Sequence, residues 1–135
     1  MTAATMTRAA LHSIATCFIV RNVPDTLSYY CDHLGFEVMY SAPETDPFFA
    51  IVQRDGVMIF VKAISKEVAP LPNSERHPWA QWDAYVYVPE PDALADEFTS
   101  RGATLSKPLE VNSDNLRGFE IKDPDGYVLF FGRPH

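Results

Sequence analysis

The residues best suited to chemistry lie in one short segment, residues 82–88, which reads WDAYVYV. Alternation along a β-strand puts Asp83, Tyr85 and Tyr87 on one face and small apolar residues on the other. A carboxylate beside two phenol hydroxyls could bind a flat or positively charged organic molecule. The same residues could also move a proton, with Asp83 as general base and Tyr85 or Tyr87 as acid, because burial raises the pKa of a carboxyl group.

Histidines and cysteines predict no metal or nucleophile site. The four histidines lie before the first predicted strand, on a helix, in a connection and at the C-terminus (His12, His33, His77 and His135). The two cysteines, Cys17 and Cys31, lack metal-type spacing, and so few cysteines are typical of a reduced, cytoplasmic protein. We therefore expect no cofactor and a cytoplasmic location.

The elements that position these residues occur twice in the sequence. The pairs Pro24/Pro91, Asp25/Asp92, Leu27/Leu94 and Gly35/Gly102 share an offset of 67 residues. In each copy a β-strand runs into a Pro-Asp helix start, and a hairpin with Asp-Gly follows the helix. One supersecondary unit used twice predicts two similar halves with a groove between them.

In the first half we predict a strand at 14–21, a helix from the N-cap Asn22 to Gly35, and strands near 36–41, 48–53 and 57–63. The second half repeats this order, with strands at 82–88, 103–107, 117–122 and 127–132 and a helix at about 91–101. The predicted fold class is α+β, with two βαβββ repeats that form curved mixed sheets around a groove. The chain then forms a single domain, residues 1–135, with repeat one at about 12–64, a linker at 65–79 and repeat two at about 80–133.

Composition limits the partners of this domain. The chain has 135 residues, a net charge of −7 and a pI near 4.9. An acidic surface argues against nucleic acid and anionic membranes, and no segment is apolar enough to span a bilayer. The charge fits a neutral or cationic small molecule as the partner.

Three segments together resemble a known superfamily: residues 20–36, which contain a helix that ends in Leu-Gly-Phe, residues 82–94, and residues 117–132 with the Asp-Pro-Asp-Gly hairpin. They resemble the vicinal oxygen chelate superfamily, which includes glyoxalase I, extradiol dioxygenases, fosfomycin-resistance enzymes and bleomycin-resistance proteins. The pattern looks most like the bleomycin-resistance branch. This resemblance implies a homodimer.

The resemblance also implies where a metal would bind. Enzymes of this superfamily hold a divalent metal with four residues, one on each of four strands, and the corresponding positions are Ala15, Phe60, Asp83 and Phe130. Only Asp83 carries a donor atom, and a single carboxylate cannot hold such a metal. A shift of one residue at any position supplies no His, Asp or Glu. We therefore expect a metal-free site.

In this superfamily the sheet face away from the helices lines the groove. The expected ligand-binding residues are those on that face and at its edge: Asp83, Tyr85, Tyr87, Phe60, Phe130 and Trp82. Two other interpretations stay open: the phenylalanines fill the space of a lost metal site, or Asp83 pairs with an arginine.

Three functions are consistent with these residues. The first is a small-molecule-binding protein that sequesters an aromatic ligand, neutral or cationic, such as an antibiotic. The alternative is a lyase, isomerase or dioxygenase-like enzyme of the same superfamily that works through Asp83 and Tyr85. The third is a structural or regulatory module whose groove only mediates dimerisation.

Overall fold

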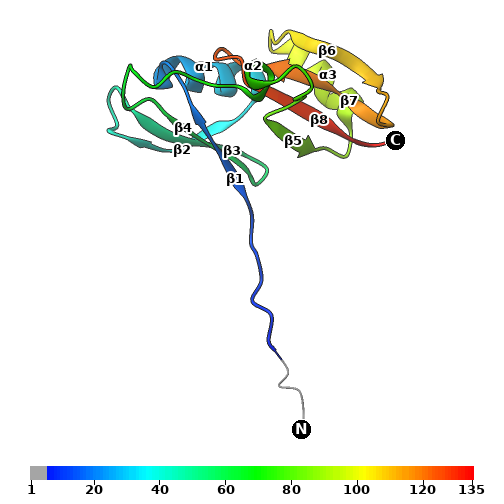
Figure 1. Cartoon of the computed structure of the whole chain (residues 1–135), viewed down its shortest axis with the longest axis horizontal. Coiled ribbons are helices and arrows are strands. Elements are labelled where there is room, and N and C mark those ends of the chain that lie inside the picture. Colours follow the sequence, from blue (N-terminus) through cyan, green and yellow to red (C-terminus); the bar gives the residue numbers. More distant parts are fainter. Residues whose placement is uncertain (1–5) are drawn as a thin grey trace.

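The computed structural model describes residues 6–135 and confirms the α+β class with two βαβββ repeats (Figure 1). Repeat one contains β1 (Ala15–Ile19), α1 (Val23–Leu34), β2 (Glu37–Ala42), β3 (Phe49–Arg54) and β4 (Val57–Lys62). Its sheet has the strand order β1-β4-β3-β2, in which β1 and β4 are parallel and the other pairs antiparallel.

Repeat two has the same topology. It contains β5 (Ala84–Tyr87), α3 (Pro91–Ser100), β6 (Leu105–Val111), β7 (Leu116–Lys122) and β8 (Val128–Pro134), in the sheet order β5-β8-β7-β6. A short helix, α2 (Asn73–Arg76), lies in the connection between the repeats, where no helix was predicted. The strand β6 also runs past its predicted end, since Pro108 is tolerated on the edge strand of a sheet.

Helix α1 begins and ends as predicted. The side chain of Asn22 accepts a hydrogen bond of 2.9 Å from the backbone N–H of Asp25, and Gly35 ends the helix with a φ of 69°. Tyr30 and Leu34 are fully buried on one face of the helix. The capping and the apolar spacing therefore position α1 on the sheet.

Both long helices cover the same side of the molecule (Figure 1). Helix α1 packs mainly on β2, β3 and β4, and α3 packs mainly on β6, β7 and β8. One apolar core contains residues of both repeats, among them Tyr30, Phe98 and Phe119. The opposite face of each sheet does not contact α1 or α3, and we refer to it as the face away from the helices, or the uncovered face.

The two repeats are joined through the hairpin turns. The ring of Tyr127, just after the turn between β7 and β8, stacks on Phe18 with centroids 4.2 Å apart, and its hydroxyl donates a 2.6 Å hydrogen bond to the carbonyl of Ile19. In the same turn, Asp123 accepts a 2.8 Å hydrogen bond from the hydroxyl of Tyr30. The Asp-Pro-Asp-Gly segment is thus a turn, as predicted, and also a connection between the repeats.

No helix within residues 6–135 is long and apolar enough to cross a membrane.

Candidate functional site

Four of the predicted ligand-binding residues form one cluster on the uncovered face of the second sheet. Ring centroids are 5.2 Å apart for Trp82 and Tyr85, 5.0 Å for Tyr85 and Phe130, 5.5 Å for Trp82 and Phe130, and 4.5 Å for Tyr85 and Tyr87. We call these residues, Trp82, Tyr85, Tyr87 and Phe130, the aromatic face. Such spacings match tilted and edge-to-face ring pairs, so the rings support one another.

Phe130 forms the base of the aromatic face. Its ring lies against Gly118 and Gly132, where an added Cβ atom would come within 2.5 Å of ring carbons. The two glycines pair across β7 and β8 and therefore let the ring approach the backbone. Phe130 is only 2% exposed, whereas Tyr87 is 73% exposed. Phe130 thus supports the cluster, and Tyr87 presents a ring to solvent.

A carboxylate that the sequence analysis did not select lies beside the aromatic face. Glu120 in β7 pairs in register with Phe130, and it is 8% exposed, with an oxygen 3.7 Å from the ammonium of Lys107. Burial raises the pKa of Glu120, and the charge of Lys107 partly opposes that shift. Strand alternation in the sequence could have predicted this position, because it puts Glu120 and Gly118 on the face of β7 opposite to Phe119 and Ile121.

Two polar atoms within the cluster have no protein partner. The indole N–H of Trp82 and the hydroxyl of Tyr85 are buried, and neither has a hydrogen-bond partner among residues 6–135. Desolvation and the neighbouring Tyr87 raise the pKa of Tyr85, so its hydroxyl keeps its proton at neutral pH. The cluster therefore holds two hydrogen-bond donors.

Asp83 lies at the start of β5, but its oxygens already have partners. One accepts a 2.8 Å hydrogen bond from the backbone N–H of Asn73, and the other accepts a 2.8 Å bond from the backbone N–H of Val128. The carboxylate thereby connects the start of α2 to β8. No arginine pairs with Asp83 in the described part of the chain.

Phe60 lies apart from the aromatic face, on the uncovered face of the first sheet. Its ring contacts Phe49 at 5.8 Å, and Phe49 contacts Tyr40 at 6.1 Å. Cys17 and Ile19 are exposed on the neighbouring strand β1. The structure therefore divides the predicted residues between two faces and shows no ring contact between Phe60 and Phe130.

The residues at the metal positions of the superfamily do not fit a metal ion. Ala15, Phe60 and Phe130 have no donor atoms, and both oxygens of Asp83 accept backbone hydrogen bonds. Within residues 6–135, no group of three His, Cys, Asp or Glu side chains is arranged to hold a metal ion. The chemistry that these side chains can support at this face is stacking, hydrogen bonding and charge pairing.

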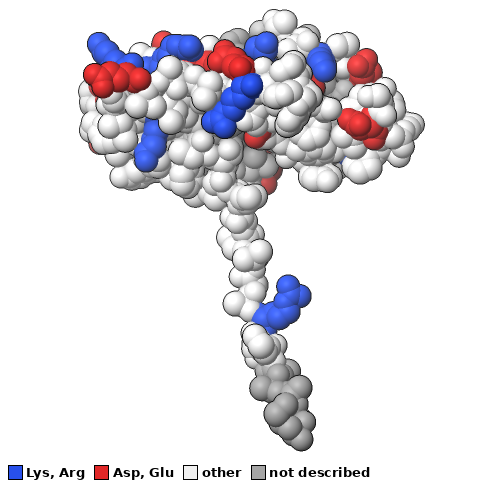
Figure 2. All heavy atoms as spheres, viewed as in Figure 1, with Lys and Arg blue, Asp and Glu red and all other residues white. Residues whose placement is uncertain are grey.

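Charged side chains are unevenly distributed over the face of the molecule seen in Figure 2. In Figure 2 most Lys, Arg, Asp and Glu atoms lie along the upper edge, near α1 and α2, while the lower edge is mostly uncharged in this view. A cavity of about 470 Å³ lies elsewhere, between the repeats on the side of α3. A smaller hollow of about 130 Å³ touches Phe130, Glu120 and Lys107 next to the aromatic face.

Comparisons with known proteins agree with this architecture. A search of curated proteins finds no match. Among solved structures, the chain is similar to TioX from Micromonospora sp. ML1, with a TM-score of 0.71 and 16% identity over 92% of this chain and 99% of that one. It is also similar to a bleomycin-binding protein from Streptomyces verticillus, solved with copper(II)-bleomycin, with a TM-score of 0.68 and 21% identity over 95% and 100% of the chains.

A third similar structure is TnmS3, an antibiotic-binding protein from Streptomyces sp. CB03234, with a TM-score of 0.69 and 16% identity over 96% and 100% of the chains. At such identities the structures show a shared fold. The sequence profile of the Glyoxalase/Bleomycin resistance protein/Dioxygenase superfamily matches residues 10–131. With its two βαβββ repeats and this match over nearly its whole length, the chain belongs to the glyoxalase/bleomycin resistance protein/dioxygenase superfamily.

Proposed function

We propose that this protein sequesters an aromatic small molecule, neutral or cationic, such as an antibiotic, at the aromatic face. The observation that carries the proposal is the cluster of Trp82, Tyr85, Tyr87 and Phe130 beside the buried carboxylate of Glu120. The similarity to a bleomycin-binding protein and to the antibiotic-binding protein TnmS3 supports this proposal.

The residues of the aromatic face and Glu120 contribute to binding in different ways. A flat ligand stacks on the exposed ring of Tyr87, and the buried rings beneath hold that ring in place. Glu120 attracts a cationic group, since it is paired only loosely with Lys107, at 3.7 Å. Sequestration requires no nucleophile and no metal, so it does not depend on metal-binding side chains at the four superfamily positions.

The proton-transfer alternative requires a free carboxylate beside Tyr85. Both oxygens of Asp83 accept backbone hydrogen bonds, so this residue is poorly placed to act as a general base. Binding without chemistry is the function that this geometry supports best. We accordingly expect binding to survive treatment of the protein with EDTA.

We also propose that the protein is a homodimer. The uncovered face of the first sheet leaves large apolar side chains in solvent, with Ile19 38% and Tyr40 54% exposed, and a second copy would bury them. Sedimentation equilibrium at micromolar concentration tests this proposal. A mass of one chain would contradict it.

Ligand binding is tested with copper-free bleomycin as the probe, followed by tryptophan fluorescence and by calorimetry. Trp82 lies in the aromatic face, whereas Trp79 is 74% exposed in the connection between the repeats. We expect saturable quenching that persists in Trp79→Phe and disappears in Trp82→Phe, with heat of binding as a readout that does not depend on either indole. Saturable binding that involves neither Trp82 nor Glu120 would contradict the proposed site.

Glu120→Gln is the matched test of charge. The substitution keeps the shape of the side chain and removes its negative charge, so we expect a cationic probe to bind about tenfold more weakly. A neutral aromatic probe should bind the variant and the parent equally. Equal loss for both probes would indicate that Glu120 supports the fold of the face rather than the charge of the ligand.

A further inference from the structure

The two repeats differ in the side chains at one pair of equivalent positions. The strand registers pair Cys17 with Phe60 in repeat one and Tyr85 with Phe130 in repeat two. The Asp-Gly turns before β4 and β8 begin at Asp55 and Asp125, 70 residues apart, and the registers then put equivalent positions of β1 and β5 68 residues apart. By these offsets Phe18 corresponds to Val86, and Tyr127 corresponds to Val57.

At the first of these two equivalent positions, beside β1, two aromatic rings fill the space between the repeats. Phe18 and Tyr127 stack with their planes 5° apart, and they are 3% and 6% exposed. They cover the inner side of β1, which lies at the edge of its sheet. At the equivalent position beside β5, Val86 and Val57 replace the two rings. Because valine is smaller, the space that the rings would fill stays open.

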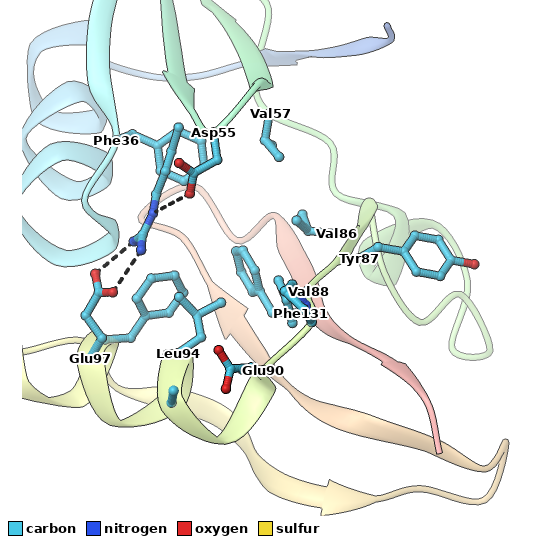
Figure 3. Close-up of a pocket in the computed structure, with 14 residues that line it drawn as sticks. Phe36, Asp55, Val57, Val86, Tyr87, Val88, Glu90, Leu94, Glu97 and Phe131 are labelled. Atoms are coloured by element: carbon cyan, nitrogen blue, oxygen red, sulfur yellow. Dashed lines mark hydrogen bonds and ion pairs between the residues drawn. The ribbon is translucent and has the colours of Figure 1, made fainter.

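The cavity between the repeats lies beside Val57 and Val86 (Figure 3). Its volume of about 470 Å³ is within the range of small-molecule sites. Apolar side chains from both repeats line it, among them Val57, Val86, Val88, Leu94 and Phe131. Helix α3 packs mainly on β6, β7 and β8, which leaves the edge strand β5 open to the cavity.

The cavity also contains a hydrogen-bond acceptor. The backbone N–H of Val88 donates to Gly132 in β8, so alternation along the edge strand β5 turns the carbonyl of Tyr87 away from the sheet. Tyr87 lines the cavity although its side chain points away from it (Figure 3), so its backbone forms this part of the wall. The equivalent carbonyl in repeat one, that of Ile19, accepts the hydroxyl of Tyr127 at 2.6 Å.

Charge at the cavity is mostly negative. Three carboxylates and one guanidinium line it: Asp55, Glu90, Glu97 and Arg54. Arg54 is held by Glu97 at 2.8 Å and lies 3.6 Å from Asp55, so its charge is already paired. Glu90 is exposed and forms no ion pair in the described part of the chain.

We propose that this inter-repeat cavity is a binding site, separate from the aromatic face, for a one-ring aromatic molecule with a hydroxyl group and a cationic amine. The ring takes the place that Tyr127 fills in the equivalent position, and the hydroxyl donates to the carbonyl of Tyr87. The amine is attracted to the unpaired carboxylate of Glu90 at the cavity mouth.

Tyramine is the probe, and 3-(4-hydroxyphenyl)propionate is the control with the same ring and the opposite charge. We expect tyramine to shift the backbone amide signals of Val57, Val86 and Val88 saturably in nitrogen-proton correlation spectra. The acid should bind about tenfold more weakly, and Glu90→Gln should remove most of that difference. Shifts confined to Trp82 and Tyr85, or no saturable shift with millimolar tyramine, would overturn the proposal.

Filling the cavity is the second test. Val57→Tyr with Val86→Phe copies the stacked pair of the equivalent place, and Ala93→Leu, at an exposed position of α3, narrows the cavity with little risk to folding. We expect either variant to bind tyramine at least about tenfold more weakly. Unchanged tyramine binding in a folded variant would overturn the proposal. Bleomycin quenching of Trp82 should remain in both variants, so the outcome for this cavity is independent of the outcome for the aromatic face.

Discussion

At the scale of single residues, Asp83 shows how tertiary contacts redefine a side chain that looks reactive in the sequence. Its carboxylate accepts backbone hydrogen bonds from Asn73 and Val128, both 2.8 Å long. Glu120, which is buried beside Phe130, is the carboxylate that we assign to the ligand. The two carboxylates therefore have separable roles.

Substitution of Asp83 tests this division. Asp83→Ala leaves two backbone N–H groups without their acceptors and should lower the free energy of unfolding by about 2 kcal/mol in urea denaturation. Asp83→Asn keeps one acceptor oxygen and should have an intermediate effect, and Asp96→Ala, at an exposed position of α3, is the control. If Asp83→Asn kept full stability but no longer bound a cationic ligand, the negative charge that attracts the ligand would be that of Asp83 and not that of Glu120.

At the scale of elements, the two helices have the same place in their repeats but different starts. Asn22 caps α1 through its side chain, whereas Glu90, the residue before α3, makes no such bond. Proline begins α3 and stands second in α1. We therefore expect removal of the Asn22 side chain to lower the free energy of unfolding more than removal of the Glu90 side chain does.

Asn22→Ala should lower the free energy of unfolding by about 1 kcal/mol, because the N–H of Asp25 loses its acceptor. Glu90→Ala is the matched control and should change stability by less than about 0.5 kcal/mol. Urea denaturation of both variants measures the difference. Equal costs would indicate that the start of α1 is fixed by packing and not by its cap.

At the scale of the whole molecule, a buried carboxyl group connects the repeats. Asp123 accepts hydrogen bonds from the hydroxyl of Tyr30 in α1 and from the backbone N–H groups of Asp125 and Tyr127. Burial raises its pKa from 3.8 to about 6, although the hydrogen bonds from Tyr30 and the backbone act in the opposite direction. We therefore expect the connection between the repeats to be sensitive to pH.

The folded protein binds more protons at Asp123 than the unfolded chain does between these two pKa values. The free energy of unfolding should consequently fall as the pH rises from about 4 to 6, and this group contributes a loss of at most about 3 kcal/mol. Asp123→Asn should flatten this part of the pH profile in urea denaturation, whereas Asp96→Asn should not. A profile of Asp123→Asn as steep as that of the parent would show that Asp123 does not titrate in this range.

Several features could be predicted from the sequence alone: the two repeats, the order of their elements, the cap and end of α1, and the alternation that puts Tyr85 and Tyr87 on one strand face. These features depend on contacts between residues that are near in sequence, such as Asn22 with Asp25. The lack of donor atoms at Ala15, Phe60 and Phe130 is likewise evident from the residue types.

Three features depend on the three-dimensional packing: which carboxylate lies beside the aromatic face, which face each aromatic ring joins, and where the cavity between the repeats lies. Both oxygens of Asp83 find partners that lie 10 and 45 residues away in the chain. The cavity exists because Val57 and Val86 occupy the places that Tyr127 and Phe18 fill on the other side of the molecule. The packing of one repeat against the other decides these features, and strand periodicity within a repeat does not contain that information.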